Sequence, residues 1–168
     1  MPLPQVLKNF NLFVDGRGYA GRAEEVNLPK ITVKTEEFRA GGMDSPVELD
    51  MGTDKLECSF SLSEYNQEVL TLWGIVVDAD TPFVFRGAVQ RQGEDAEPVI
   101  AKVRGRIKEF DPGAWKAGDK AVAKLTVAVT YYQLTVNGAV AVEIDVENMI
   151  RITNGSDQMA SLRTALGI

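Results

Sequence analysis

The sequence predicts a mainly β protein, an antiparallel β-sandwich or barrel-like fold with one internal helix and a short C-terminal helix. Long segments alternate apolar and polar residues with a period of two, which is typical of half-buried strands. Turn signals containing Gly, Pro or Asn separate these segments. The regular strand–helix alternation of a parallel sheet is missing. The length of 168 residues is near the usual size of one domain, so we expect a single domain over residues 1–168.

The first half of the chain contains three predicted strand regions. A short apolar segment at 11–14 precedes the turn signal Asp15-Gly16. Residues 30–38 alternate apolar and polar, and Gly41-Gly42 interrupts the pattern before alternation resumes at 47–51. After Gly52 the apolar residues move from odd to even positions, which requires a bulge or bend near that glycine.

The second half predicts longer strands. Residues 83–90 and 99–110 are expected to form a hairpin. A long strand at 121–136 continues through Asn137-Gly138, a strong hairpin signal, into a strand at 139–144. In the long strand, the alternation places Tyr132 on the face of Thr126, and Tyr131 on the face of Leu125.

Two helices are predicted from capping signals. Ser63 is expected to be the N-cap of a helix that carries Tyr65 and Val69 and ends at Gly74. Ser156 is expected to cap a short C-terminal helix that stops at Gly167.

Composition argues against several function classes. The chain has no histidine, the usual general base and the commonest metal ligand, so catalysis is not expected. Cys58 is the single cysteine and alternates with apolar residues, which predicts a buried small hydrophobe rather than a metal ligand. The net charge of −6 opposes tight binding of nucleic acid. The chain shows neither a signal-peptide pattern nor an apolar run long enough for a membrane anchor.

Two short motifs are rejected as sites. Residues 16–21 match the dinucleotide fingerprint GxGxxG, but no helical pattern follows and Pro29 comes early, so a glycine-rich turn between strands is predicted and no cofactor. Scattered acidic residues lack the spacing of a calcium loop, so no metal site is expected. These acidic residues are Asp44, Asp50, Asp54, Asp78 and Asp80.

A basic stripe follows one strand. Lys102, Arg104, Arg106 and Lys108 share a face and lack interleaved aromatic residues, so inter-strand or inter-subunit ion pairing is predicted rather than nucleic-acid binding. The candidate acidic partners on other strands are Glu36, Glu48, Asp50 and Glu57. The amount of long amphipathic strand in so small a chain also predicts assembly, because sheet edges and faces must be covered.

Several blocks, in order along essentially the whole chain, give a family resemblance. They are residues 28–43, 111–118, the pair Tyr131-Tyr132 with Leu134, residues 143–145 with Asn148, 154–159 and 166–168. The chain resembles the major tail tube proteins of contractile-tailed (myovirus-type) phages and R-type tailocins.

The resemblance implies a structural subunit and no enzyme. Hexameric rings would stack into a hollow tube for DNA passage or membrane puncture, with strands of all subunits joining into one ring-wide lumenal barrel. The implied partners are further copies of the chain, the tail sheath protein, baseplate or tube initiator and tail terminator proteins, the tape measure protein in the lumen, and DNA in transit without tight binding. The implied location is the virion or tailocin particle, assembled in the host bacterial cytoplasm. An inter-ring loop is implied at Arg39, Ala40, Gly41, Gly42, Met43, Asp44, Ser45 and Pro46.

The polar strand faces are expected to line the lumen. They carry Thr32, Lys34, Glu36, Glu48, Asp50, Lys124, Thr126 and Thr130. Two alternatives stay open: a secretion-system-like tube protein of similar architecture, and a small-ligand binding β-barrel, whose signature would be a stable monomer with an apolar cavity.

Overall fold

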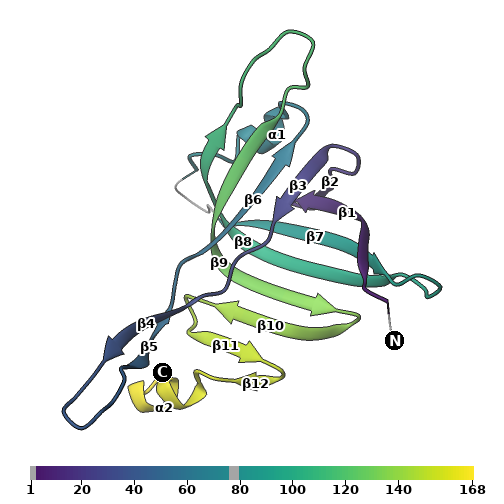
Figure 1. Cartoon of the computed structure of the whole chain (residues 1–168). Helices are drawn as coiled ribbons and strands as arrows, with labels where there is room; N and C mark the ends of the chain where they lie inside the picture. Colours follow the sequence, from purple (N-terminus) through teal and green to yellow (C-terminus); the bar gives the residue numbers. More distant parts are fainter. Residues whose placement is uncertain (1–2, 76–79) are drawn as a thin grey trace.

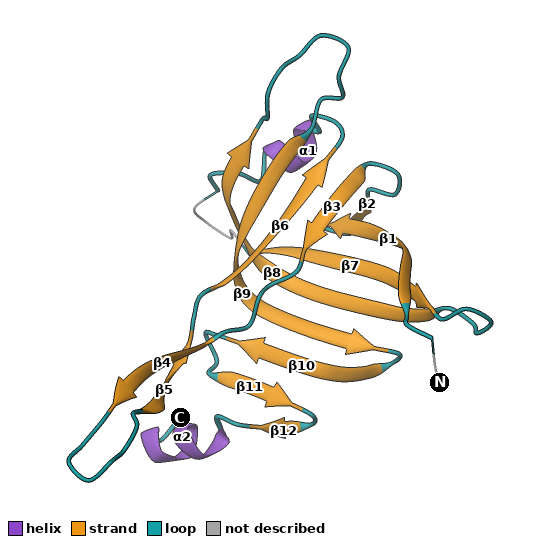
Figure 2. Ribbon diagram, viewed as in Figure 1, coloured by secondary structure: helices purple, strands orange, loops and turns teal. Residues whose placement is uncertain are grey.

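The computed structural model describes residues 3–75 and 80–168 and is built almost entirely of antiparallel strands (Figures 1 and 2). The strands are β1 (Val6–Val14), β2 (Arg17–Gly18), β3 (Ala23–Asn27), β4 (Val33–Phe38), β5 (Val47–Thr53), β6 (Leu56–Leu62), β7 (Thr81–Gln90), β8 (Glu97–Asp111), β9 (Ala123–Val136), β10 (Ala139–Asp145), β11 (Ile150–Thr153) and β12 (Ser156–Asp157). The helices are α1 (Gln67–Leu70) and α2 (Ala160–Leu166). The predicted fold class is confirmed.

The two longest strands, β8 and β9, belong to both layers of the fold. The first part of β8 pairs with β7, whereas its last residues pair only with β9. In the same way β9 pairs first with β6 and then with β10. One layer therefore contains β3, β6, the first half of β9 and the last half of β8. The other runs from β2 and β1 through β7, β8 and β9 to β10, β11 and β12.

Both long strands change partners at the same place, where Gly105 of β8 lies next to a bulge at Thr130 of β9. Thr130 is an extra residue in β9, because Arg104 pairs with Tyr131 while Gly105 pairs with Val129. A Cβ added at Gly105 would lie 2.1 Å from the Ala128 carbonyl oxygen, so only glycine permits this close approach. The extra residue reverses the alternation: Tyr132 is buried and Tyr131 lies on the other face. The sequence-based placement of these two tyrosines was therefore wrong.

The core lies between the two layers. Phe60 of β6 packs on Phe83 and Phe85 of β7, with ring centroids 5.7 and 6.3 Å apart. Leu12 and Leu125 beside them are completely buried. The predicted burial of the single cysteine is also confirmed: Cys58 is only 2% exposed, and burial raises its pKa to about 12, which keeps the thiol protonated and unreactive.

The helix ends differ from the prediction. α1 is capped by Asn66, whose Oδ1 accepts hydrogen bonds from the Glu68 and Val69 amides, while Ser63 donates to the Arg22 carbonyl. α2 follows Met159 without a side-chain cap, since Ser156 is part of β12. Its predicted end is confirmed, because Gly167 adopts the left-handed conformation with φ 76°.

Two glycine predictions are confirmed. The GxGxxG segment forms turns around β2 and leads into strand β3 rather than a helix. At Gly52, with φ 96°, two residues of β5 oppose the single residue Lys34 of β4, which is a β-bulge.

The ribbon formed by β4 and β5, hereafter the arm, projects away from the two layers (Figure 1). Every residue of both strands is exposed. Among the described residues, neither helix has the length and apolar character needed to cross a membrane.

Candidate assembly surfaces

The arm is amphipathic. Its register pairs Glu36 with Leu49 and Phe38 with Val47, so these four side chains share one face. Phe38, Val47 and Leu49 are 50%, 44% and 46% exposed, an unusual amount of bare apolar surface for one short ribbon.

The opposite face of the arm is acidic. Thr35 lies opposite Asp50, and Glu37 lies opposite Glu48. Glu36 and Glu48 therefore lie on different faces of the ribbon, and whether either of them lines a lumen remains a prediction. The cause is the register: even-numbered residues of β4 pair with odd-numbered residues of β5, so Glu36 faces Leu49 and not Glu48. The pattern of a single strand does not reveal this register.

The tip of the arm contains the predicted loop at 39–46. The Met43 amide donates to the Ala40 carbonyl at 3.2 Å, and Arg39 Nε donates to the Met43 carbonyl at 3.2 Å. Gly42 supplies the left-handed residue of this turn, with φ 89°. Contact between this loop and a neighbouring ring remains a prediction.

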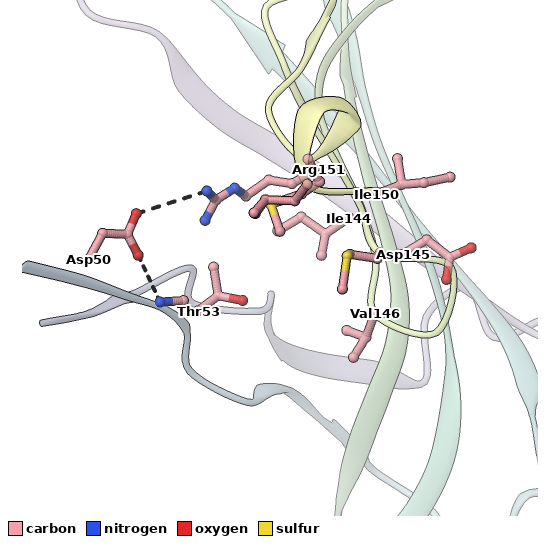
Figure 3. A pocket seen from close by; sticks show the side chains of 11 residues that line it. Asp50, Thr53, Ile144, Asp145, Val146, Ile150 and Arg151 are labelled. Atoms are coloured by element: carbon pink, nitrogen blue, oxygen red, sulfur yellow. Dashed lines mark hydrogen bonds and ion pairs between the residues drawn. The ribbon is translucent and has the colours of Figure 1, made fainter. Parts of the chain in front are cut away.

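The base of the arm borders a cleft of about 480 Å³ (Figure 3). Asp50 and Thr53 stand on one side, and residues of β10, β11 and α2 form the other. Across it, an Asp50 carboxylate oxygen lies 4.0 Å from Arg151 Nη2, while the other accepts a hydrogen bond from the Gly52 amide at 2.7 Å. No local sequence pattern indicates this ion pair, because its partners are far apart in the chain.

Strands β11 and β12 and helix α2 form one wall of this cleft, hereafter the C-terminal wall. Charge-assisted hydrogen bonds stabilise this wall. Arg163 donates to Asp157 at 2.5 Å and to the Met149 carbonyl at 2.6 Å. The bond from Arg163, together with bonds from the Met159 and Arg151 amides, lowers the pKa of Asp157.

Next to this wall, Asp145 stabilises the turn after β10. It accepts hydrogen bonds from the Asn148 backbone and side-chain amides at 3.0 and 2.7 Å. Burial raises the pKa of Asp145, but these bonds outweigh burial and leave that pKa below its ordinary value.

The basic stripe lies on the solvent face of β8, as the alternation predicted. Lys108 pairs with Glu57, which also binds Lys55. These bonds, that from Lys108 first, lower the pKa of Glu57.

Farther along the stripe, Arg104 stacks on the Tyr131 ring, 4.7 Å from its centroid, and lies 4.0 Å from Asp145. Lys102 and Arg106 have no ion pair among the described residues. Of the proposed partners, Glu57 meets the stripe within the chain, and Asp50 pairs with Arg151 instead. Pairing of the remaining cations between subunits stays a prediction.

Three of the residues expected to line the lumen come together. Thr32, Lys124 and Thr126 line one open polar cleft between the arm base and the outer face of β6 and β9. Thr130 is apart from it, in the bulge, where its hydroxyl donates to Asp80 at 3.1 Å. Lys34, Glu36, Glu48 and Asp50 are carried by the arm. Within the described ranges, no group of acidic or cysteine side chains could hold a metal ion.

Residues 4–167 match the family model of the phage tail tube protein FII. The chain belongs to this family. Its sequence is 39% identical to the tail tube protein of Escherichia phage P2, with both chains covered completely, and 34% identical to the major tail tube protein of Serratia phage KSP20, over 94% of this chain and 92% of that protein. It is a tail tube protein of the contractile-phage type, as the resemblance implied.

Solved structures share the fold. The sheath/tube terminator structure of the extracellular contractile injection system PVC gives a TM-score of 0.61 at 14% identity, over 80% of this chain and 97% of that one. The PVC sheath-tube complex gives 0.60 at 14% identity, over 80% and 92%. The baseplate of the anti-feeding prophage gives 0.55 at 12% identity, over 80% and 97%. The tail tube fold thus recurs in these injection particles.

Proposed function

We propose that this tail tube protein forms hexameric rings that stack into the hollow inner tube of a contractile particle. The arm is the observation that carries this proposal. Its apolar face is bare along its whole length, and isolated two-stranded ribbons are marginally stable in water, so another molecule must cover it. In a tail tube, the molecule that covers this face is a further copy of the chain.

Ring closure also accounts for the edges of the sheets. Among the described strands, β3 pairs only with β6, so its other side offers backbone groups that no described strand pairs. A closed ring removes such edges when a strand of the next subunit pairs there. On this proposal, β3, β6 and parts of β8 and β9 form one sector of a ring-wide lumenal barrel. The cleft containing Thr32, Lys124 and Thr126 faces its interior.

The charge balance fits a conduit better than a nucleic-acid binder. The chain carries −6 overall, and two of the four stripe cations have carboxylates nearby within the subunit. Such a wall offers passing DNA few contacts through which phosphates could release counterions. We further propose that the subunit has no enzymatic activity.

The remaining partners follow from a place in the tube: a sheath protein outside, baseplate or initiator and terminator proteins at the ends, and a tape measure protein within. The particle is a virion tail or a tailocin, assembled in the host bacterial cytoplasm.

Electron microscopy of concentrated purified protein tests the proposal. Wild-type protein should give stacked rings, and a deletion of residues 40–45 should give a folded subunit that does not elongate, because the arm tip is lost. Circular dichroism establishes that the deletion variant folds. A wild-type sample that contains only monomers at all concentrations contradicts the proposed function, and normal tubes from the deletion variant contradict the role of the loop.

A further inference from the structure

The loop between β8 and β9 presents an exposed aromatic side chain. Trp115 is 85% exposed, although an indole has a large apolar surface that water solvates poorly. The loop lies at the end of the molecule opposite the arm and α2 (Figures 1 and 2). Trp115 belongs to one of the segments that carry the family resemblance, but neither ring closure nor the arm contact proposed above involves it.

Trp115 is held in place despite its exposure. Its indole N–H donates to the Tyr65 hydroxyl at 2.8 Å, and that hydroxyl donates to the Pro112 carbonyl. The loop base is closed as well: a Cβ at Gly113 would lie 2.7 Å from the Val122 carbonyl oxygen, so the two loop ends touch. The indole is therefore pre-organised, which lowers the entropic cost of binding through it.

The cleft at the arm base has the complementary shape and chemistry. Its volume is about 480 Å³, whereas an apolar cavity of about 150 Å³ already accepts benzene. Its apolar lining comes from Ile144, Val146, Met149, Ile150, Met159 and Leu162. Methionine side chains adapt readily to an aromatic partner.

Charge does not oppose a contact between the two surfaces. In the cleft, Asp50 lies 4.0 Å from Arg151, and Arg104 lies 4.0 Å from Asp145. On the loop, Lys120 pairs with Glu24 at 2.5 Å, and Lys116 lies 3.7 Å from Asp119. Both surfaces therefore carry balanced charge, so no like-charge repulsion opposes the apolar contact.

We propose that Trp115 of one copy inserts into the arm-base cleft of a copy in the next ring. This inference rests on the proposed function and names the contact that repeats along the tube. Because the two surfaces differ and lie at opposite ends of the molecule, the contact is head-to-tail and continues indefinitely. It also places a buried tryptophan in a pocket, the arrangement in which a single side chain dominates an interface.

Two tryptophan variants test the energetic part. Trp115→Ala should raise the protein concentration required for tube assembly about thirtyfold or more, as expected for an interface hot spot. Trp73→Ala is the matched control, because Trp73 is also exposed (54%) but lies beside α1, and it should assemble like wild type. Melting curves of the unassembled proteins separate an assembly defect from misfolding.

A cysteine pair tests the position without removing the indole. Lys116→Cys combined with Leu162→Cys should form a ladder of inter-subunit disulfides in oxidised tubes. Lys116→Cys with Ser161→Cys is the control, because Ser161 does not line the cleft. The native Cys58 is buried and does not compete.

The outcomes distinguish the two proposals. Normal tubes from Trp115→Ala together with no ladder from the 116/162 pair overturn this inference and leave the proposed function intact. An equal or stronger ladder from the 116/161 pair also overturns it. Wild-type protein that forms no tubes overturns the proposed function and this inference with it.

Discussion

Strands β5 and β6 follow each other in the chain and have the same alternation, yet they have opposite fates. In β6, Leu56, Cys58, Phe60 and Leu62 are at most 4% exposed. In β5, Val47, Leu49 and Met51 are between 44% and 55% exposed. The two strands are separated only by Asp54 and Lys55. Their different burial therefore cannot come from local sequence preference.

The difference comes from which molecule covers each apolar face. The β6 face is closed by β1 and β7 of the same chain. The β5 face has no layer above it within the described part of the chain. Alternation indicates that a strand has one apolar face, but it does not indicate whether the covering partner belongs to the same subunit. For a tube protein, the first kind of face governs folding and the second governs assembly.

The largest expected effect separates these two kinds of face. Phe60→Ala should destabilise the monomer by about 3–5 kcal/mol, because a large buried ring leaves a cavity. Phe38→Ala, on the apolar face of the arm, should change monomer stability by no more than about 0.5 kcal/mol. Urea unfolding of unassembled protein gives both values.

Tube yield should show the opposite order. Relative to the loss of monomer stability, Phe38→Ala should lower tube yield more than Phe60→Ala does. Phe38→Ala should reduce assembly while the monomer melts as wild type does. If Phe38→Ala instead lowers monomer stability as much as Phe60→Ala, the arm packs within its own subunit and the comparison fails.

A second prediction concerns the bend that lets one strand serve both layers. Gly105→Ala should destabilise the monomer by about 1–3 kcal/mol, because the added methyl group would overlap the Ala128 carbonyl. Gly41→Ala at the arm tip is the matched control. A Cβ there meets nothing within 4 Å, and Gly41 does not have positive φ, so its stability should be unchanged. Thermal melting distinguishes the two variants, and equal melting temperatures would contradict the steric role of Gly105.

The same comparison explains how far the sequence could predict the molecule. The longer strands, the Asn137-Gly138 hairpin and the bulge at Gly52 depend on local patterns and were predicted. The short strands β2, β3, β11 and β12 were not. The faces of Tyr131 and Tyr132 depend on the bulge at Thr130, which follows from the close approach of β8 at Gly105. A glycine within an otherwise regular strand was the available signal.

The surfaces were harder to predict than the strands. The split of Glu36 and Glu48 between two faces depends on the register of β4 against β5, and the Asp50–Arg151 pair depends on tertiary packing. Neither has a local signature. Trp115 did have one, a tryptophan in a loop rich in glycine and charge, although its exposure became evident only from the structure.

A smaller effect is expected from the basic stripe. Two of its cations have partners within the subunit, and the other two have no ion pair among the described residues. Arg104→Glu with Arg106→Glu should cost the monomer about 0.5–1 kcal/mol, because the stacking of Arg104 on Tyr131 is lost and a carboxylate is placed near Asp145. Tube yield should fall further than this loss explains, since each contact repeats in every subunit. Equal tube yield from the variant and wild type would show that the stripe is only a solvated surface.

The smallest effect concerns charge in the C-terminal wall, where Asp157 is partnered within the chain, unlike Glu37 of the arm among the described residues. Asp157→Asn keeps the shape and one acceptor oxygen but removes the charge that binds Arg163. The variant should melt at a lower temperature near neutral pH, whereas Glu37→Gln on the arm should not, because none of the ion pairs within the described residues involves Glu37.

The pH dependence decides whether charge is the cause. The folded pKa of Asp157 lies below its ordinary value, chiefly because of the hydrogen bond from Arg163. Unfolding therefore takes up a proton, so the stabilisation is fully present above the unfolded pKa and is lost as pH falls through the folded pKa. The melting difference between Asp157→Asn and wild type should be largest at about pH 6 and should shrink as pH falls below the unfolded pKa of about 3.9. A difference that stays constant over this range would mean that Asp157 acts through its hydrogen-bond geometry, and that the charge on the C-terminal wall contributes nothing to folding.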